Sequence, residues 1–281
     1  MRIDSHHHIW DLNVRPQTWM QGDELKPISR TILMNELEPE LDKASINYTV
    51  IVQTVPLVDE TPELLDLSIS HPKVCAVVGW LDLESEDIRP QLEKYLNHPG
   101  GKNLVSIRDM AQDKADPNWL LREDVIKNIH RVAEYGLTFD ILTRPPQLSA
   151  AIEMVKRSPN NTFVLDHISK PYIAKNEFQP WADQISQIAS NENVSVKVSG
   201  LFTEAKWSNW SNQTFRPYFD HILNSFSPSR MMFGSDWPVC LLAATYSQTI
   251  NLMEELSKEF TKTEQESFWS GTAKQSYRLK V

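Results

Sequence analysis

Short apolar segments recur along the whole chain, separated by longer stretches of mixed composition. Each segment is rich in Val, Ile and Leu, shows little polar alternation, and follows the previous one after roughly 25 to 35 residues, the spacing of strand–helix units. Continuous apolar runs of this kind are typical of parallel strands that are covered on both faces. The predicted strands are Arg2–His8, Tyr48–Thr54, Val74–Trp80, Leu104–Arg108, Thr138–Leu142, Thr162–Asp166, Val194–Ser199 and Arg230–Ser235.

The stretches between these segments predict amphipathic helices. From Leu120 through Val125, Ile129 and Val132, for example, apolar residues recur at helical spacing. Eight strands alternating with helices favour an α/β fold, a closed (β/α)8 TIM barrel. We expect one domain over residues 1–281, because no linker or low-complexity segment interrupts the pattern. A doubly wound open sheet has the same local pattern and remains an alternative at this stage.

Composition narrows the classes of partner. The net charge of −9 and the absence of Lys and Arg runs disfavour nucleic acid. The N-terminus enters a polar, His-rich segment without the apolar stretch of a secretory signal or membrane helix, so we expect a cytoplasmic protein with no membrane partner. Cys75 and Cys240 lie in no paired-thiol or zinc-knuckle spacing, and no disulfide is expected.

The first predicted strand ends in a histidine cluster. Side chains alternate along a strand, so His6 and His8 should share one face while His7 points to the other. One divalent ion could therefore bind both His6 and His8. The alternatives are a purification-tag fragment or a solvated loop tip. A tag is disfavoured because the cluster has only three histidines, embedded between Ile3 and Ile9.

The last predicted strand places a carboxylate at the same end of the barrel. Asp236 follows the apolar run Met231–Phe233 closely. First and last strands become neighbours when a barrel closes, so Asp236 should face the histidines of the first strand. The alternative is that Asp236 caps the next helix, with Pro238 as an early helical residue.

Other predicted strands also end in polar residues, where the active site of a barrel lies. His167 and Lys170 follow the sixth strand. Arg108 ends the fourth strand, where it could donate to a carbonyl or hydroxyl oxygen of a ligand. Its alternative is an ion pair with Asp109 or another nearby acid.

The fifth and seventh strands carry one charged residue each. Asp140 could accept hydrogen bonds from substrate hydroxyls or pair with Arg108. Lys197 is interpreted as structural.

In their order, these segments resemble the amidohydrolase-related sugar lactonases, a family that includes L-fuconolactonases and L-rhamnonolactonases. The resemblance covers essentially the whole chain. It is carried by Asp4–Trp10, Ser106–Asp109, Leu165–Pro171, Lys197–Leu201, Gly234–Val239, and Gly271–Ala273 with Tyr277. It implies a (β/α)8 barrel and hydrolysis of a carbonyl ester in a small ring, at a site built from His6, His8, His167 and Asp236.

The resemblance also bears on the metal. Two-metal amidohydrolases usually present a bridging Lys or Glu after strand four and a His after strand five, whereas this chain has Arg108 and Asp140 there. We therefore expect one divalent ion, for which zinc suits the nitrogen and oxygen ligands, as manganese also would. The expected ligands are His6, His8 and Asp236, with His167 as a further candidate. Some relatives work without a metal, so metal-independent activity is the alternative prediction.

The predicted reaction is the opening of a sugar lactone, such as L-fucono- or L-rhamnonolactone, by water. Asp236 would accept the proton of the attacking water. The developing oxyanion charge would fall on the metal or, if the metal is absent, on Arg108 and His167. The expected substrate-binding residues, which would contact the sugar ring and its hydroxyls, are Trp10, Asp140, Lys170, Trp207 and Trp237. Trp210 lies in the same loop as Trp207.

Two other functions are considered. A related barrel could decarboxylate a small carboxylic acid with a similar metal site. A non-catalytic barrel could bind a carbohydrate or a protein, although imidazoles and a carboxylate converging on one rim are costly to keep without a use.

Overall fold

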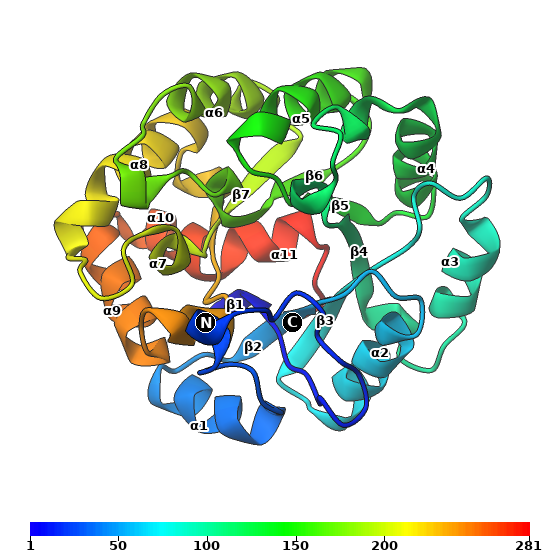
Figure 1. Cartoon of the computed structure of the whole chain (residues 1–281), viewed down its shortest axis with the longest axis horizontal. Coiled ribbons are helices and arrows are strands. Elements are labelled where there is room, and N and C mark those ends of the chain that lie inside the picture. Colours follow the sequence, from blue (N-terminus) through cyan, green and yellow to red (C-terminus); the bar gives the residue numbers. More distant parts are fainter.

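Eight parallel strands follow one another around a ring in the computed structural model, which describes residues 1–281 (Figure 1). Neighbouring strands are hydrogen-bonded in chain order. Most observed strands end one or two residues before the predicted boundary, whereas the fourth ends one residue after it, at Asp109. The strands are β1 Ile3–His7, β2 Tyr48–Val52, β3 Val74–Gly79, β4 Leu104–Asp109, β5 Thr138–Ile141, β6 Phe163–Leu165, β7 Val194–Val198 and β8 Met231–Phe233.

The ring closes between the first and last strands. The Asp236 amide donates to the His6 carbonyl at 2.8 Å, and the His8 amide donates to the Trp237 carbonyl at 2.7 Å. These bonds lie just beyond β8, so closure brings the residues after β8 directly beside those of β1. The barrel prediction is confirmed, and the open sheet is excluded.

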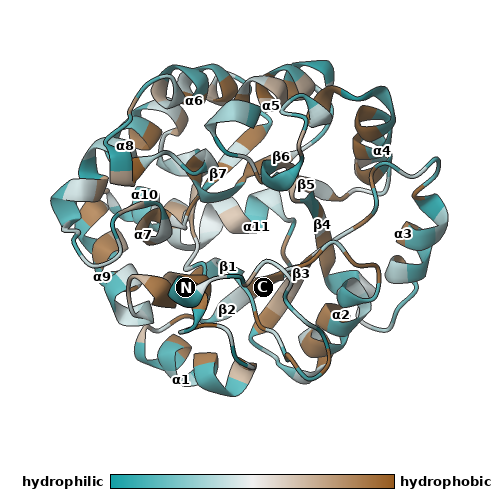
Figure 2. Cartoon of the chain, in the orientation of Figure 1, coloured by the Kyte–Doolittle hydropathy of each residue, from teal (hydrophilic) through white to brown (hydrophobic).

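Helices surround the strands on the outside (Figure 1). Helix α4 shows why they form there: Val125, Ile129 and Val132 are fully buried on one face, and Figure 2 shows the brown apolar side of α4 beside its teal polar side. The helices are α1 Met34–Lys43, α2 Glu60–Ser70, α3 Arg89–Leu96, α4 Glu123–Glu134, α5 Pro145–Arg157, α6 Trp181–Ala189, α7 Leu201–Glu204, α8 Asn212–Phe226, α9 Tyr246–Leu256, α10 Lys262–Glu266 and α11 Thr272–Ser276.

The interior of the barrel is apolar toward the amino ends of the strands. Small and medium side chains form one buried cluster there, and α11, which crosses the centre of the ring in Figure 1, closes it from below. We call this cluster the floor. Its buried members are Ile3, Val50, Val52, Ala76, Val78, Val164, Met232, Ala273 and Tyr277.

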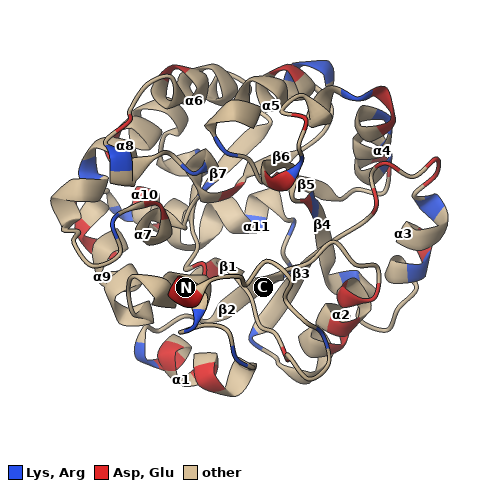
Figure 3. Cartoon of the chain, viewed as in Figure 1, with Lys and Arg blue, Asp and Glu red and all other residues tan.

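The outer surface carries charges of both signs, interspersed over the helices in Figure 3. Cys75 and Cys240 are free thiols. No helix combines the length and the apolar character needed to cross a bilayer.

Candidate active site

A cavity of about 340 Å³ opens at the carboxyl ends of the strands, and we call it the mouth. Residues that follow most of the strands line it, together with two side chains from the long loop after β1. The lining residues are His8, Trp19, Leu25, Thr54, Arg108, Met110, Gln112, Asp113, Leu142, Arg144, His167, Lys170, Thr203, Glu204, Trp207, Asp236, Val239 and Leu242.

Three imidazoles surround one carboxylate oxygen at the bottom of the mouth. The Nε2 atoms of His8, His6 and His167 lie 3.5, 3.9 and 3.9 Å from Oδ1 of Asp236. The Nε2 atoms of His6 and His8 are 3.1 Å apart. All four side chains are buried. The structure therefore brings together the four residues that the sequence placed on three separate strands.

Hydrogen bonds to the outer ring nitrogens orient two of these imidazoles. Nδ1 of His8 donates to the Val52 carbonyl at 2.7 Å, and Nδ1 of His167 bonds to the Ser199 hydroxyl at 2.9 Å. Their Nε2 atoms consequently face Asp236. His7 points elsewhere, toward the Thr49 hydroxyl.

Burial determines the charge state of the cluster. Desolvation is the largest effect on His6, His8 and His167, and it lowers the pKa of each imidazole below its ordinary value. All three rings are therefore neutral near pH 7 and can offer nitrogen lone pairs. Asp236 does not act as the N-cap considered from the sequence, because no side-chain cap precedes the short turn Val239–Leu242.

An unusual turn presents His167 to the mouth. Four successive residues, His167 to Lys170, have φ between +46° and +59°, a left-handed conformation that is costly for residues other than glycine. Trp181 supports the turn by donating to the Ile168 carbonyl at 2.7 Å. Gly200 packs under the ring, where an added Cβ would lie 2.8 Å from Nδ1 of His167. The turn places His167 and Lys170 on the same cavity.

This donor set fits a divalent metal ion. Ligand atoms of His6, His167 and Asp236 all lie within 4.8 Å of one another, and His8 lies beside them. Neutral imidazoles with a carboxylate are the ligands that zinc takes in catalytic sites.

Arg108 lies at the inner wall of the mouth and forms an ion pair there. Its Nη1 is 3.0 Å from Oδ2 of Asp166 and 3.4 Å from Nε2 of His6. The partner is therefore Asp166, whereas Asp109 lies 3.4 Å from Lys114. The guanidinium still lines the cavity, so it is both paired and available to a ligand.

Asp140 does not line the mouth, in contrast to its predicted role in reading substrate hydroxyls. Its carboxylate is fully buried below the site and is bonded to Nζ of Lys197 at 2.7 Å, to the Tyr277 hydroxyl at 2.7 Å and to the Ser106 hydroxyl at 2.6 Å. Asp140 and Arg108 are register partners on adjacent strands, but only the long arginine side chain reaches the cavity. Lys197, fully buried, also lies 3.2 Å from Nδ1 of His6.

The tryptophans divide into two groups. Trp10 and Trp237 are buried outside the mouth, and the Trp10 indole donates to the Arg30 carbonyl at 2.8 Å. Neither lines the cavity, in contrast to their predicted contact with substrate, although His8 and Asp236 nearby in sequence do. Trp207 and Lys170 do line the mouth.

Sequence reasoning missed several lining residues. Arg144 and Glu204 come after β5 and β7, and their charged groups lie 3.4 Å apart across the cavity rim. Their positions after strand ends could have signalled them. Trp19 carries no such signal, because it belongs to a long loop whose path only the folded chain defines.

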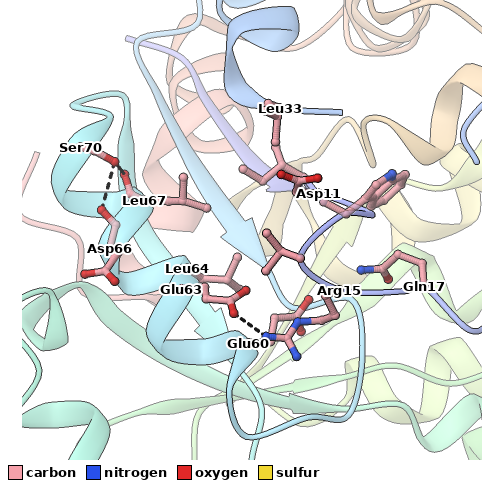
Figure 4. A pocket seen from close by; sticks show the side chains of 13 residues that line it. Asp11, Arg15, Gln17, Leu33, Glu60, Glu63, Leu64, Asp66, Leu67 and Ser70 are labelled. Carbon is pink, nitrogen blue, oxygen red and sulfur yellow. Dashed lines mark hydrogen bonds and ion pairs between the residues drawn. The ribbon is translucent and has the colours of Figure 1, made fainter. Parts of the chain in front are cut away.

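A second hollow lies on the side of the barrel, between α2 and the loop that follows β1 (Figure 4). Figure 4 shows Arg15 bonded to Glu63, at 2.6 Å, on its wall. This hollow shares no lining residue with the mouth and contains no imidazole. Of these two hollows, only the mouth gathers imidazoles beside a carboxylate.

Comparisons with known proteins show the family to which the chain belongs. A family model described as Amidohydrolase matches residues 3–279. L-fucono-1,5-lactonase of Burkholderia ambifaria is 35% identical over 245 residues, covering 87% of this chain and 83% of that protein. L-fucono-1,5-lactonase of Burkholderia multivorans is 31% identical over 290 residues, covering 99% and 96%. A crystal structure of a B. multivorans amidohydrolase with bound zinc matches with a TM-score of 0.92 at 32% identity, covering 99% of both chains. The chain belongs to the amidohydrolase family and is an enzyme homologous to lactonases.

Proposed function

We propose that this enzyme opens a sugar lactone, an aldonolactone of the L-fucono-1,5-lactone type, by attack of water on the ring carbonyl. One observation carries the proposal: the Asp236 carboxylate lies among three neutral imidazoles at the bottom of a cavity large enough for a sugar ring. Likeness to two L-fucono-1,5-lactonases supports the substrate class.

Asp236 acts as the base. It accepts a proton from water as the water oxygen forms a bond to the carbonyl carbon. The carbonyl π electrons move to oxygen, and when they return, the bond from carbon to the ring oxygen breaks. Asp236 gives its proton to that ring oxygen, so the products are the hydroxyl and the carboxylic acid of the open sugar acid.

The oxyanion that forms in this step needs donors. In the metal-free enzyme, Arg108 provides a guanidinium held in place by Asp166, and His167 provides an imidazole fixed by Ser199. Hydrogen-bond donors that are already oriented before the reaction begins lower its barrier, because the protein does not have to reorganise around the new charge. A divalent ion, when bound, polarises the carbonyl and lowers the pKa of a bound water; we assign it the ligands His6, His8 and Asp236, with His167 as a further ligand.

The outer part of the mouth binds the sugar. Trp207 offers an aromatic surface and Lys170 an ammonium group, and both line the cavity. Sugar rings stack on indoles, and a lysine can donate to ring hydroxyls.

Hydrolysis of a panel of aldonolactones tests the proposal. L-fucono-, L-rhamnono- and L-galactono-lactones and D-series rings are offered to purified enzyme before and after chelation, and acid release is followed. Activity that falls with chelator and returns with zinc supports the metal-assisted reaction. Activity that does not change with chelator supports lactone hydrolysis and shows that the reaction does not require a metal. If the enzyme hydrolyses no lactone but releases carbon dioxide from a small carboxylic acid, the lactonase proposal is wrong and the enzyme is a decarboxylase.

A further inference from the structure

The charges that line the mouth balance one another. Its cationic side chains are Arg108, Arg144 and Lys170, and its acidic side chains are Asp113, Glu204 and Asp236. A site for a carboxylated ligand would normally leave at least one cation unpaired, because arginine binds carboxylates through paired hydrogen bonds. Here the inner arginine is already bonded to Asp166.

Glu204 forms an ion pair with one of the two outer cations, Arg144. It is the last residue of α7, and its side chain is only 11% exposed. One of its oxygens, Oε2, lies 3.4 Å from Nη1 of Arg144, the residue that precedes α5.

Glu204 also acts on Lys170. Burial lowers the pKa of that lysine, and the largest opposing effect is the charge of Glu204. Glu204 therefore pairs with Arg144 and acts by its charge on Lys170, with which it forms no ion pair, and both cations would otherwise attract an anion.

We propose that Glu204 is the specificity-determining residue that reserves the mouth for uncharged lactones and excludes rings bearing a carboxylate. It does so in two ways: it occupies Arg144, and its own charge repels an incoming anion at close range. The substrate class rests on the proposed function, whereas the charge selection itself concerns binding and does not require turnover.

The first test compares two sugars that differ in one group. D-galacturonate carries a carboxylate where D-galactose carries a hydroxymethyl group, and neither contains a lactone, so neither is consumed. Binding of both is measured by calorimetry to the wild-type enzyme and to Glu204→Gln. We expect the ratio of galacturonate to galactose affinity to rise about tenfold in Glu204→Gln, and the gain to shrink at high salt.

Asp113→Asn is the matched control. It removes the same charge from the same cavity, but no ion pair of Asp113 with a cation is present, and its side chain is exposed. We expect little change in the affinity ratio. The double variant Glu204→Gln, Arg144→Gln should lose most of the gain, because the freed guanidinium is the proposed anchor.

The outcomes separate the two proposals. An unchanged ratio in Glu204→Gln overturns the specificity role, and so does an equal rise in Asp113→Asn, which would reflect the general field of the mouth. If the wild-type enzyme hydrolyses no lactone while Glu204→Gln alone gains affinity for galacturonate, the lactonase proposal fails and the charge selection stands.

Discussion

The two ends of the barrel interior differ in composition although the same strands build both. At the floor, Val52, Val78 and Met232 pack together fully buried. At the mouth end, charged and imidazole side chains replace them. Along the last strand the chain passes from apolar Met232 to Asp236 within four positions.

This contrast shows how the barrel buries charged side chains at one end while its other end remains an apolar core. Buried charges below the mouth have partners: Lys197 lies 2.7 Å from Asp140 and 3.0 Å from Asp166, and Arg108 also pairs with Asp166. Burying an unpaired charge costs several kcal/mol, so the pairing is required. The floor contributes stability through apolar burial, and the mouth end contributes the chemistry.

The largest expected effect is on catalysis at the mouth. Asp236→Asn removes the proposed base but keeps the shape, so kcat should fall about a hundred- to ten-thousandfold. Steady-state hydrolysis of the best lactone measures it. Asp113→Asn, with the same charge change in the same cavity, should lose far less, and near-normal turnover by Asp236→Asn would contradict the assigned role.

Breaking the buried charge network should cost the most stability. Lys197→Met leaves Asp140 and Asp166 without their shared ammonium, so the free energy of unfolding should fall by about 3 to 5 kcal/mol. Urea denaturation measures the loss. Lys258→Met, which removes an exposed lysine beside Glu255, should change stability by less than about 1 kcal/mol. Equal effects of the two variants would show that the buried network has no special importance.

A divalent ion should stabilise the mouth end specifically. Zinc at about a hundred times its Kd should add about 2.7 kcal/mol to the free energy of unfolding, because only the folded chain assembles the ligands. Thermal unfolding with and without zinc gives the shift. His8→Ala, which removes one expected ligand, should reduce it strongly. A shift that is the same in His8→Ala would place the ion elsewhere.

The smallest expected effect concerns the floor. Val52→Ala removes buried methyl groups and should lower the free energy of unfolding by about 1 to 3 kcal/mol, with turnover close to wild type below the unfolding transition. Val14→Ala is the control, since Val14 is 64% exposed. A large loss of turnover in Val52→Ala at full folding would mean that floor and mouth are not separable.

The sequence-based predictions succeeded where a local rule applies. The eight strands followed from apolar runs. The rule that polar residues ending parallel strands meet at one edge brought His6 and His8 toward Asp236, and the resemblance to the sugar lactonases added His167 to them. The rule failed for Asp140, because a short side chain at that level stays below the cavity while Arg108 reaches it. It failed also for Trp10 and Trp237, which are buried outside the cavity although His8 and Asp236 line it.

The sequence by itself predicted eight strands alternating with helices, the edge that carries the chemistry and the residue types gathered there, because apolar runs and the residues that end them are local properties of the chain. The tertiary structure decided that the strands close into a barrel and not an open sheet. Only the tertiary structure decided which charges face substrate and which neutralise one another. Arg144 and Glu204 are 60 positions apart, and Asp140 meets a hydroxyl from Tyr277, 137 positions away. Such pairings depend on side-chain length and on the direction of each side chain in the closed ring, which no local pattern of residues encodes.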